Sequence, residues 1–83
     1  MTRQEARHEL RTWVTNTTRT PPADLRDDTP ILEQRIITSL DVAELVLFLE
    51  DLRGKPIDYT LLNGASLRSV DAICTAFLAD FES

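Results

Sequence analysis

The sequence predicts an all-α protein, a bundle of three long helices and one short helix around a single core. Apolar residues recur at steps of three and four in three segments, near residues 3–16, 38–52 and 69–81, and this is the spacing of an amphipathic helix. All four prolines and both glycines fall between these segments, where they favour turns. No segment alternates apolar and polar residues over a useful length, so strands are not expected.

The first helix is expected over about residues 3–16. Ala6, Leu10, Trp13 and Val14 recur on one face, with charged residues between them. This apolar face is narrow and must pack on another element. A loop is expected next, over residues 17–28, because two adjacent prolines and many polar residues interrupt the helical spacing. The residues expected to hold this connection against the core are Leu25, Ile31 and Leu32.

The second helix is expected to begin at Thr38. Thr38 and Asp41 fit the start signature of a helix. In this signature a hydroxyl accepts a hydrogen bond from a first-turn amide, and a carboxylate three residues later interacts with the free N–H donors and the positive helix end. The helix should run to about Leu52, because Gly54 and Pro56 supply a stop signal.

Apolar residues surround most of this second helix and fall into two stripes. The stripe expected to face the core comprises Val42, Leu45, Val46, Leu49 and Leu52. The other stripe comprises Leu40, Ala43 and Leu47. One stripe is enough to attach a helix to a core, so the second stripe either is buried as well or binds a partner.

The rest of the chain is expected to hold a short irregular stretch, one helical turn near residues 64–68 and a last helix. Ser69 is a suitable N-cap for that helix. Its inward stripe would comprise Val70, Ile73, Cys74, Phe77, Leu78 and Phe81.

Composition restricts the function. The chain has 83 residues, of which 42% are hydrophobic and 28% charged, and this fits one compact domain over residues 1–83. The single cysteine, Cys74, excludes an internal disulfide and a cysteine-rich zinc site, and the single histidine, His8, adds no ligand cluster, so no metal is expected. Such cysteine usage is typical of a reducing compartment, and we expect a cytoplasmic protein.

Neither a membrane segment nor an active site is expected. The longest unbroken apolar run, residues 45–49, is far below the roughly 20 residues that span a bilayer, and the N-terminus is charged from Arg3 onward. Two separated glycines are too few for a phosphate-binding loop. A small bundle also leaves little room for a pocket that excludes water, so we expect no catalytic residues and no enzyme activity.

The charge is distributed unevenly. Residues 1–35 carry six arginines against six acidic residues, whereas residues 36–83 carry three basic against eight acidic residues, so the whole net charge of −5 lies in the second part. An acidic surface opposes the binding of nucleic acid, whose phosphates attract lysine and arginine. It favours protein partners with basic patches.

Ser39 is the residue that points to a function. It stands at the opening of the second helix, where its hydroxyl can face solvent beside the unpaired first-turn amides. A phosphate esterified to this oxygen would lie where the helix dipole and the free N–H groups favour a negative charge. The simpler alternative is a serine that only caps the helix.

These features together resemble the acyl and peptidyl carrier proteins. The signature of that family is a serine followed by leucine at the start of the second helix, with a hydrophobic and acidic helix after it. The matching stretch, residues 38–50, reads TSLDVAELVLFLE. The resemblance covers about residues 24–81. Ile36 and Thr38 stand where the family usually has glycine and aspartate.

The resemblance implies a non-catalytic carrier. Ser39 would bear a 4'-phosphopantetheine arm, added from coenzyme A by a phosphopantetheinyl transferase, and the terminal thiol would hold an acyl or aminoacyl group as a thioester. A loading ligase or transferase and downstream synthase enzymes would be further partners. Both chain ends lie close to predicted helices, so we expect a discrete carrier. We also expect it to be monomeric. Residues 36–40 and 47–50 resemble those of carriers in polyketide, nonribosomal peptide and related antibiotic pathways.

The resemblance also implies a partner-binding face on the second helix. The residues that match the family's exposed apolar contacts beside the arm are Leu40, Ala43 and Leu47. Those that match acidic positions facing basic residues of partner enzymes are Asp41, Glu44, Glu50 and Asp51. The rival interpretation is a helical adaptor that binds a basic partner without a prosthetic group.

Overall fold

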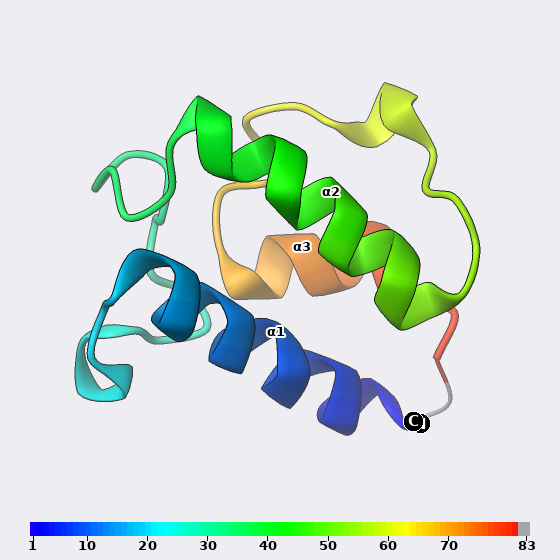
Figure 1. Ribbon diagram of the computed structural model, residues 1–83, viewed down its shortest axis with the longest axis horizontal. Coiled ribbons are helices and arrows are strands. Elements are labelled where there is room, and N and C mark those ends of the chain that lie inside the picture. Colours follow the sequence, from blue (N-terminus) through cyan, green and yellow to red (C-terminus); the bar gives the residue numbers. More distant parts are fainter. Residues whose placement is uncertain (82–83) are drawn as a thin grey trace.

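The computed structural model describes residues 1–81, which form three α-helices, two short 3-10 helices and no β-strand. The elements in chain order are α1 (Arg3–Thr18), η1 (Pro22–Asp24), α2 (Ser39–Arg53), η2 (Tyr59–Leu61) and α3 (Val70–Phe77). In Figure 1, α3 lies between α1 and α2, and long connections flank the helices. The prediction of an all-helical chain is therefore confirmed. Each helix of residues 1–81 is too short or too polar to cross a bilayer.

A capping box that was not expected from sequence begins α1. The backbone N–H of Glu5 donates to Thr2 Oγ1 (3.1 Å), and the N–H of Thr2 donates to Glu5 Oε1 (3.3 Å). The helix runs to Thr18, two residues beyond the expected end, and stops at Arg19, whose φ of 56° is left-handed.

Arg19→Gly is expected to stabilise the protein by about 0.5–1 kcal/mol. A residue with a Cβ atom costs about 1–2 kcal/mol in the left-handed region, and glycine removes most of that cost while losing more entropy on folding. The melting temperature should rise by a few degrees. Arg19→Ala is the matched control, because it removes the charge but keeps the Cβ atom. An equal gain with alanine would contradict the conformational explanation.

The start and end of α2 agree with the expectations from sequence. Thr38 and Asp41 form a capping box at its start, in which Asp41 Oδ2 accepts from the Thr38 N–H (2.9 Å) and from the Thr38 hydroxyl (3.2 Å). The helix ends at Arg53, and Gly54 follows with a left-handed φ of 71°, which its missing side chain permits.

The last helix, α3, is shorter than expected. Ser69 caps it as predicted, because its Oγ accepts from the N–H of Ala72 (3.1 Å). The helix ends at Phe77, although the apolar spacing continues to Phe81. The residues after the helix still pack inward, since Leu78 is buried and Phe81 is half-buried.

Polar contacts from distant elements hold the segment after α3. The Arg3 Nε donates to the carbonyl oxygen of Phe81 (3.0 Å). The carboxylate of Asp80 pairs with Arg53 Nη2 (3.0 Å) and with Lys55 Nζ (2.9 Å). These contacts, formed with the start of α1 and the end of α2, replace the helical continuation that the spacing predicted.

The single helical turn expected near residues 64–68 is present as an isolated turn, in which the N–H of Leu67 donates to the carbonyl of Asn63 (3.1 Å) with the spacing of an α-helix. A separate 3-10 helix, η2, lies earlier in this connection, and residues 64–67 do not continue into a regular helix. The reason lies in two side chains that bond the local backbone: Asn63 Oδ1 accepts from the N–H of Ser66 (2.9 Å), and Ser66 Oγ donates to the carbonyl of Leu61. Such bonds compete with helical ones.

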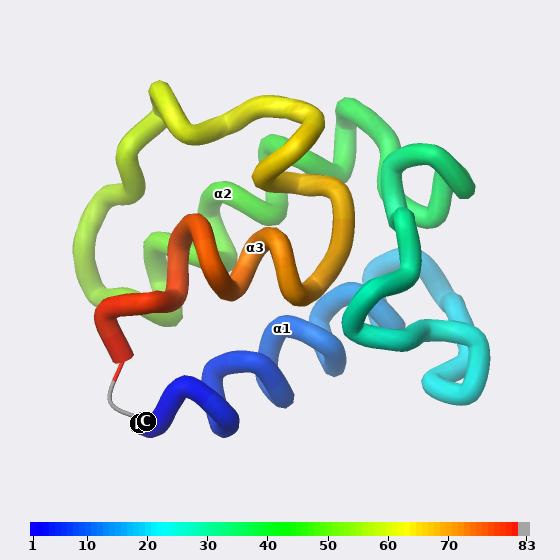
Figure 2. The backbone as a smooth tube through the Cα atoms, turned by 180° about the vertical axis from the view of Figure 1, so that it is seen from behind, coloured from blue at the N-terminus to red at the C-terminus, as the bar shows by residue number. Residues whose placement is uncertain are grey.

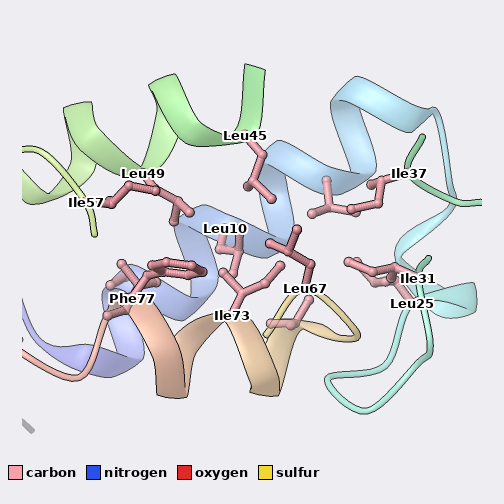
Figure 3. Packing of buried hydrophobic residues seen from close by; sticks show 14 residues of the cluster. Leu10, Leu25, Ile31, Ile37, Leu45, Leu49, Ile57, Leu67, Ile73 and Phe77 are labelled. Atoms are coloured by element: carbon pink, nitrogen blue, oxygen red, sulfur yellow. The ribbon is translucent and has the colours of Figure 1, made fainter. Parts of the chain in front are cut away.

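One buried apolar cluster joins the three α-helices and the connections between them (Figure 3). Leu45 and Leu49 of α2 reach into this cluster, and Ile73 and Phe77 of α3 meet them from below. Of the predicted core residues of α1, Ala6, Leu10 and Val14 are buried. Trp13 is half-buried and stacks on Phe48 at the edge of the cluster, with ring centroids 5.5 Å apart. Three buried apolar residues were not assigned to the core from sequence, namely Ile37, Ile57 and Leu67.

The long connection between α1 and α2 is fastened at several points. Leu25 and Ile31 are buried, as expected. The side chains of Arg7 and Arg11 on α1 both bond the carboxylate of Asp27, the Arg7 contact measuring 3.0 Å. The N–H of Asp71 at the start of α3 donates to the Asp27 carbonyl (2.8 Å), and its carboxylate pairs with Arg7. The arginines of α1 are thus used inside the fold.

Candidate functional site

Ser39 is the first residue of α2, and its side chain is exposed. The cap of the helix is supplied by Thr38 and Asp41, so the Ser39 hydroxyl is not required for that role. The amides of the first turn and the positive helix end lie beside it. A hydroxyl in this position is accessible to a modifying enzyme, and a phosphate on it would meet a favourable field.

The second apolar stripe of α2 lies on the surface. Leu40 is 83% exposed, Leu47 is 64% exposed and Ala43 is exposed as well, whereas Leu45 and Leu49 on the other side are fully buried. Residues at positions 40, 43 and 47 follow one another at three and four residues and therefore share one face of the helix. Of the two alternatives for this stripe, burial is thus excluded, and the stripe is free to meet a partner.

The four acidic residues assigned to the partner-binding face differ in their surroundings. Glu44 and Asp51 are exposed, beside the apolar stripe. Asp41 is half-buried and engaged in the helix cap. Glu50 is half-buried too, and its Oε2 accepts from the backbone N–H of Ile57 (3.2 Å) and from the hydroxyl of Tyr59 (3.2 Å). Only two of these four acids are therefore free to face a partner.

Two exposed apolar residues of η2 were not assigned to the site from sequence. Tyr59 is 60% exposed and Leu61 is 41% exposed. The connection that carries them passes alongside α2 in Figures 1 and 2. Their sequence neighbourhood has no helical period, so no pattern placed them near α2. The large apolar residues exposed within residues 1–81 are Leu40, Leu47, Tyr59, Leu61 and Met1.

Cys74 and His8 are the other side chains that could be reactive. Cys74 is half-buried, and burial raises the pKa of its thiol, an effect that the neighbouring Arg7 only partly offsets. His8 is exposed on α1. No three His, Cys, Asp or Glu side chains of the described chain lie together as metal ligands would.

No family model matches the chain, and no curated protein matches it.

Proposed function

We propose that the chain is a non-catalytic carrier protein in which Ser39 bears a 4'-phosphopantetheine arm and holds an acyl or aminoacyl group as a thioester. The observation that carries the proposal is the exposed hydroxyl of Ser39 at the first position of α2, beside a cap that other residues supply. In the attachment step, Ser39 Oγ forms a bond to the phosphorus next to pantetheine in coenzyme A. The bond to the adenosine bisphosphate breaks, and a base of the transferase takes the hydroxyl proton.

The arrangement of helices supports assignment to the four-helix carrier fold. Helices α1 and α2 have 16 and 15 residues, and a long connection joins them. The 3-10 helix η2 would take the place of the short helix that precedes the last one in that fold. The eight residues of α3 make it the shortest of the three α-helices.

The surface of α2 supports a role in brief encounters with enzymes. Exposed Leu40 and Leu47 offer a small apolar contact, and exposed Glu44 and Asp51 beside them attract basic residues. Charge complementarity raises the rate of association, whereas a small contact area lets partners separate quickly. The partners proposed are a phosphopantetheinyl transferase, a loading ligase or transferase and the synthase enzymes of a cytoplasmic polyketide, nonribosomal peptide or related pathway.

The direct test is the intact mass of the protein after incubation with coenzyme A and a broad-specificity phosphopantetheinyl transferase. A carrier gains the mass of one phosphopantetheine, and the same mixture without transferase shows no gain. The rival function, a helical adaptor without a prosthetic group, leaves the mass unchanged. An unchanged mass, with a known carrier modified under the same conditions, would refute the proposal.

Glu44→Lys is expected to lower the kcat/KM of modification by the transferase by about tenfold at low salt, with the fold unchanged. Glu44 is exposed, so the reversed charge costs little stability but opposes basic partner residues. Glu9→Lys is the matched control, because Glu9 is an exposed residue of α1. An equal loss in both variants would show that net charge alone matters, and the loss should shrink as salt is added.

A further inference from the structure

The carboxylate of Glu50 forms hydrogen bonds within its own chain, which a residue that only contacts a partner would not require. One carboxylate oxygen accepts two hydrogen bonds, from the backbone of Ile57 and from the side chain of Tyr59, both at 3.2 Å. Ile57 is buried in the core cluster, so the segment is held at its inner side as well. These contacts attach the connection after α2 to the last turns of that helix.

The hydrogen bonds of Glu50 position two exposed apolar side chains, those of Tyr59 and Leu61. Glu50 follows Leu47 by three residues, so the two side chains are neighbours on the helix surface. The Tyr59 hydroxyl reaches Glu50, which brings the tyrosine next to the exposed stripe of α2. Leu61 belongs to the same 3-10 helix, η2, as Tyr59.

We infer that Glu50 is a positioning residue, which fastens η2 to α2 so that Tyr59 and Leu61 extend the apolar surface of Leu47 into a docking surface made of two elements. The occupant is an enzyme surface with an apolar recess bordered by lysine or arginine. This inference rests on the proposed carrier function, and the first enzyme to dock is the phosphopantetheinyl transferase.

The charges around this surface argue for a basic border on the partner. Glu44 and Asp51 flank the stripe on α2, and Asp58 precedes η2. The Thr60 hydroxyl and N–H donate to Asp58, at 2.6 and 2.9 Å, and these bonds hold the pKa of its carboxyl below the usual range, so the group stays ionised. The basic residues nearby, Arg53 and Lys55, both pair with Asp80.

The contact between Glu50 and Tyr59 can be measured without any partner. The hydrogen bond to Glu50, and its negative charge, raise the pKa of the Tyr59 hydroxyl. The chain has one tyrosine, so a spectrophotometric titration reports this group alone. Glu50→Ala is expected to return the pKa to about 10. An unchanged titration curve would overturn the proposed attachment.

The role of Glu50 in docking is tested by the kcat/KM of modification by the transferase. Tyr59→Ala is expected to lower it by about tenfold, as truncation of an aromatic contact does. Glu50→Gln keeps an oxygen acceptor, so its kcat/KM should stay within about twofold of the wild-type value. Glu50→Ala removes the acceptor, so its kcat/KM should fall about as far as that of Tyr59→Ala. Combined with Tyr59→Ala, Glu50→Ala should add no further loss, because both variants remove the same arrangement.

Asp51→Asn is the matched comparison for Glu50→Gln, because both remove one charge from adjacent acidic residues. The exposed Asp51 is expected to matter through its charge, so Asp51→Asn should slow modification and Glu50→Gln should not. Equal losses for Glu50→Gln and Glu50→Ala, additive with Tyr59→Ala, would overturn the inference, since Glu50 would then contact the partner itself. If Tyr59→Ala were modified at the wild-type rate, η2 would not be part of the docking surface.

The two proposals fail in distinguishable ways. A wild-type protein that the transferase never modifies refutes the carrier function, and with it the docking surface. A wild-type protein that is modified, in which Tyr59→Ala reacts at the wild-type rate, refutes only the extension onto η2. Circular dichroism of each variant shows whether the helices are retained, so that a loss of rate is compared among folded proteins.

Discussion

Leu45→Asp is expected to unfold the protein at room temperature. Leu45 is fully buried and points from α2 into the core cluster (Figure 3). Truncating a buried leucine costs about 2–5 kcal/mol, and an unpaired carboxyl in an apolar site costs several kcal/mol more. The whole free energy of unfolding of a small domain is about 5–15 kcal/mol. Far-UV circular dichroism and thermal melting should show a largely unfolded chain.

Leu47→Asp is the matched control, two residues further along the same helix. Its side chain is 64% exposed, so the same substitution leaves a carboxyl in water, and the melting temperature should change by only a few degrees. This variant should be folded but poorly modified by the transferase, because an apolar contact is lost. If Leu47→Asp unfolded the protein and Leu45→Asp did not, the two faces of α2 would be assigned the wrong way round.

Ser39→Ala is expected to abolish the gain of phosphopantetheine while the protein stays folded. The hydroxyl is the only group that the proposed reaction consumes at this position, and alanine offers no nucleophile. Because Thr38 and Asp41 supply the helix cap, the substitution should change the free energy of unfolding by less than about 0.5 kcal/mol. Intact mass and thermal melting measure the two effects on one sample.

Ser69→Ala provides the opposite pattern at another helix start. Ser69 is buried, and its Oγ accepts from the N–H of Ala72 (3.1 Å), so its loss should cost about 1 kcal/mol of stability. Modification by the transferase should persist in this variant. A mass gain that survives Ser39→Ala and disappears in Ser69→Ala would move the attachment site to α3 and refute the assignment of Ser39.

The features predictable from sequence are those that depend on neighbours along the chain. The caps at Thr38 and Ser69 were recognisable because each needs only residues within three positions, and Gly54 marked the end of α2 in the same local way. The two faces of α2 followed from helical spacing, which separates buried Leu45 from exposed Leu47 by 200° around the axis at 100° per residue.

Most features that were not expected from sequence depend on residues far apart in the chain, although the capping box of Thr2 and Glu5 is local and its spacing was recognisable. The apolar spacing after Phe77 is that of a helix, but contacts from Arg3, Arg53 and Lys55 hold the following segment in another conformation. Glu50 has the same acidic character as Asp51, and only the fold shows that one of them bonds Tyr59. A linear pattern records which residues are charged, but it does not record which charges are already satisfied.

The contact between Arg3 and the carbonyl of Phe81 joins the first turn of α1 to the segment after α3. In Figure 1 this junction lies at the opposite side of the molecule from the start of α2. An affinity tag or fluorescent label attached at the N-terminus would therefore stand clear of Ser39. Because the first turn of α1 lies close to the segment after α3, the chain is also suited to circular permutation. A short peptide could join these two segments while new chain ends are opened in a surface turn.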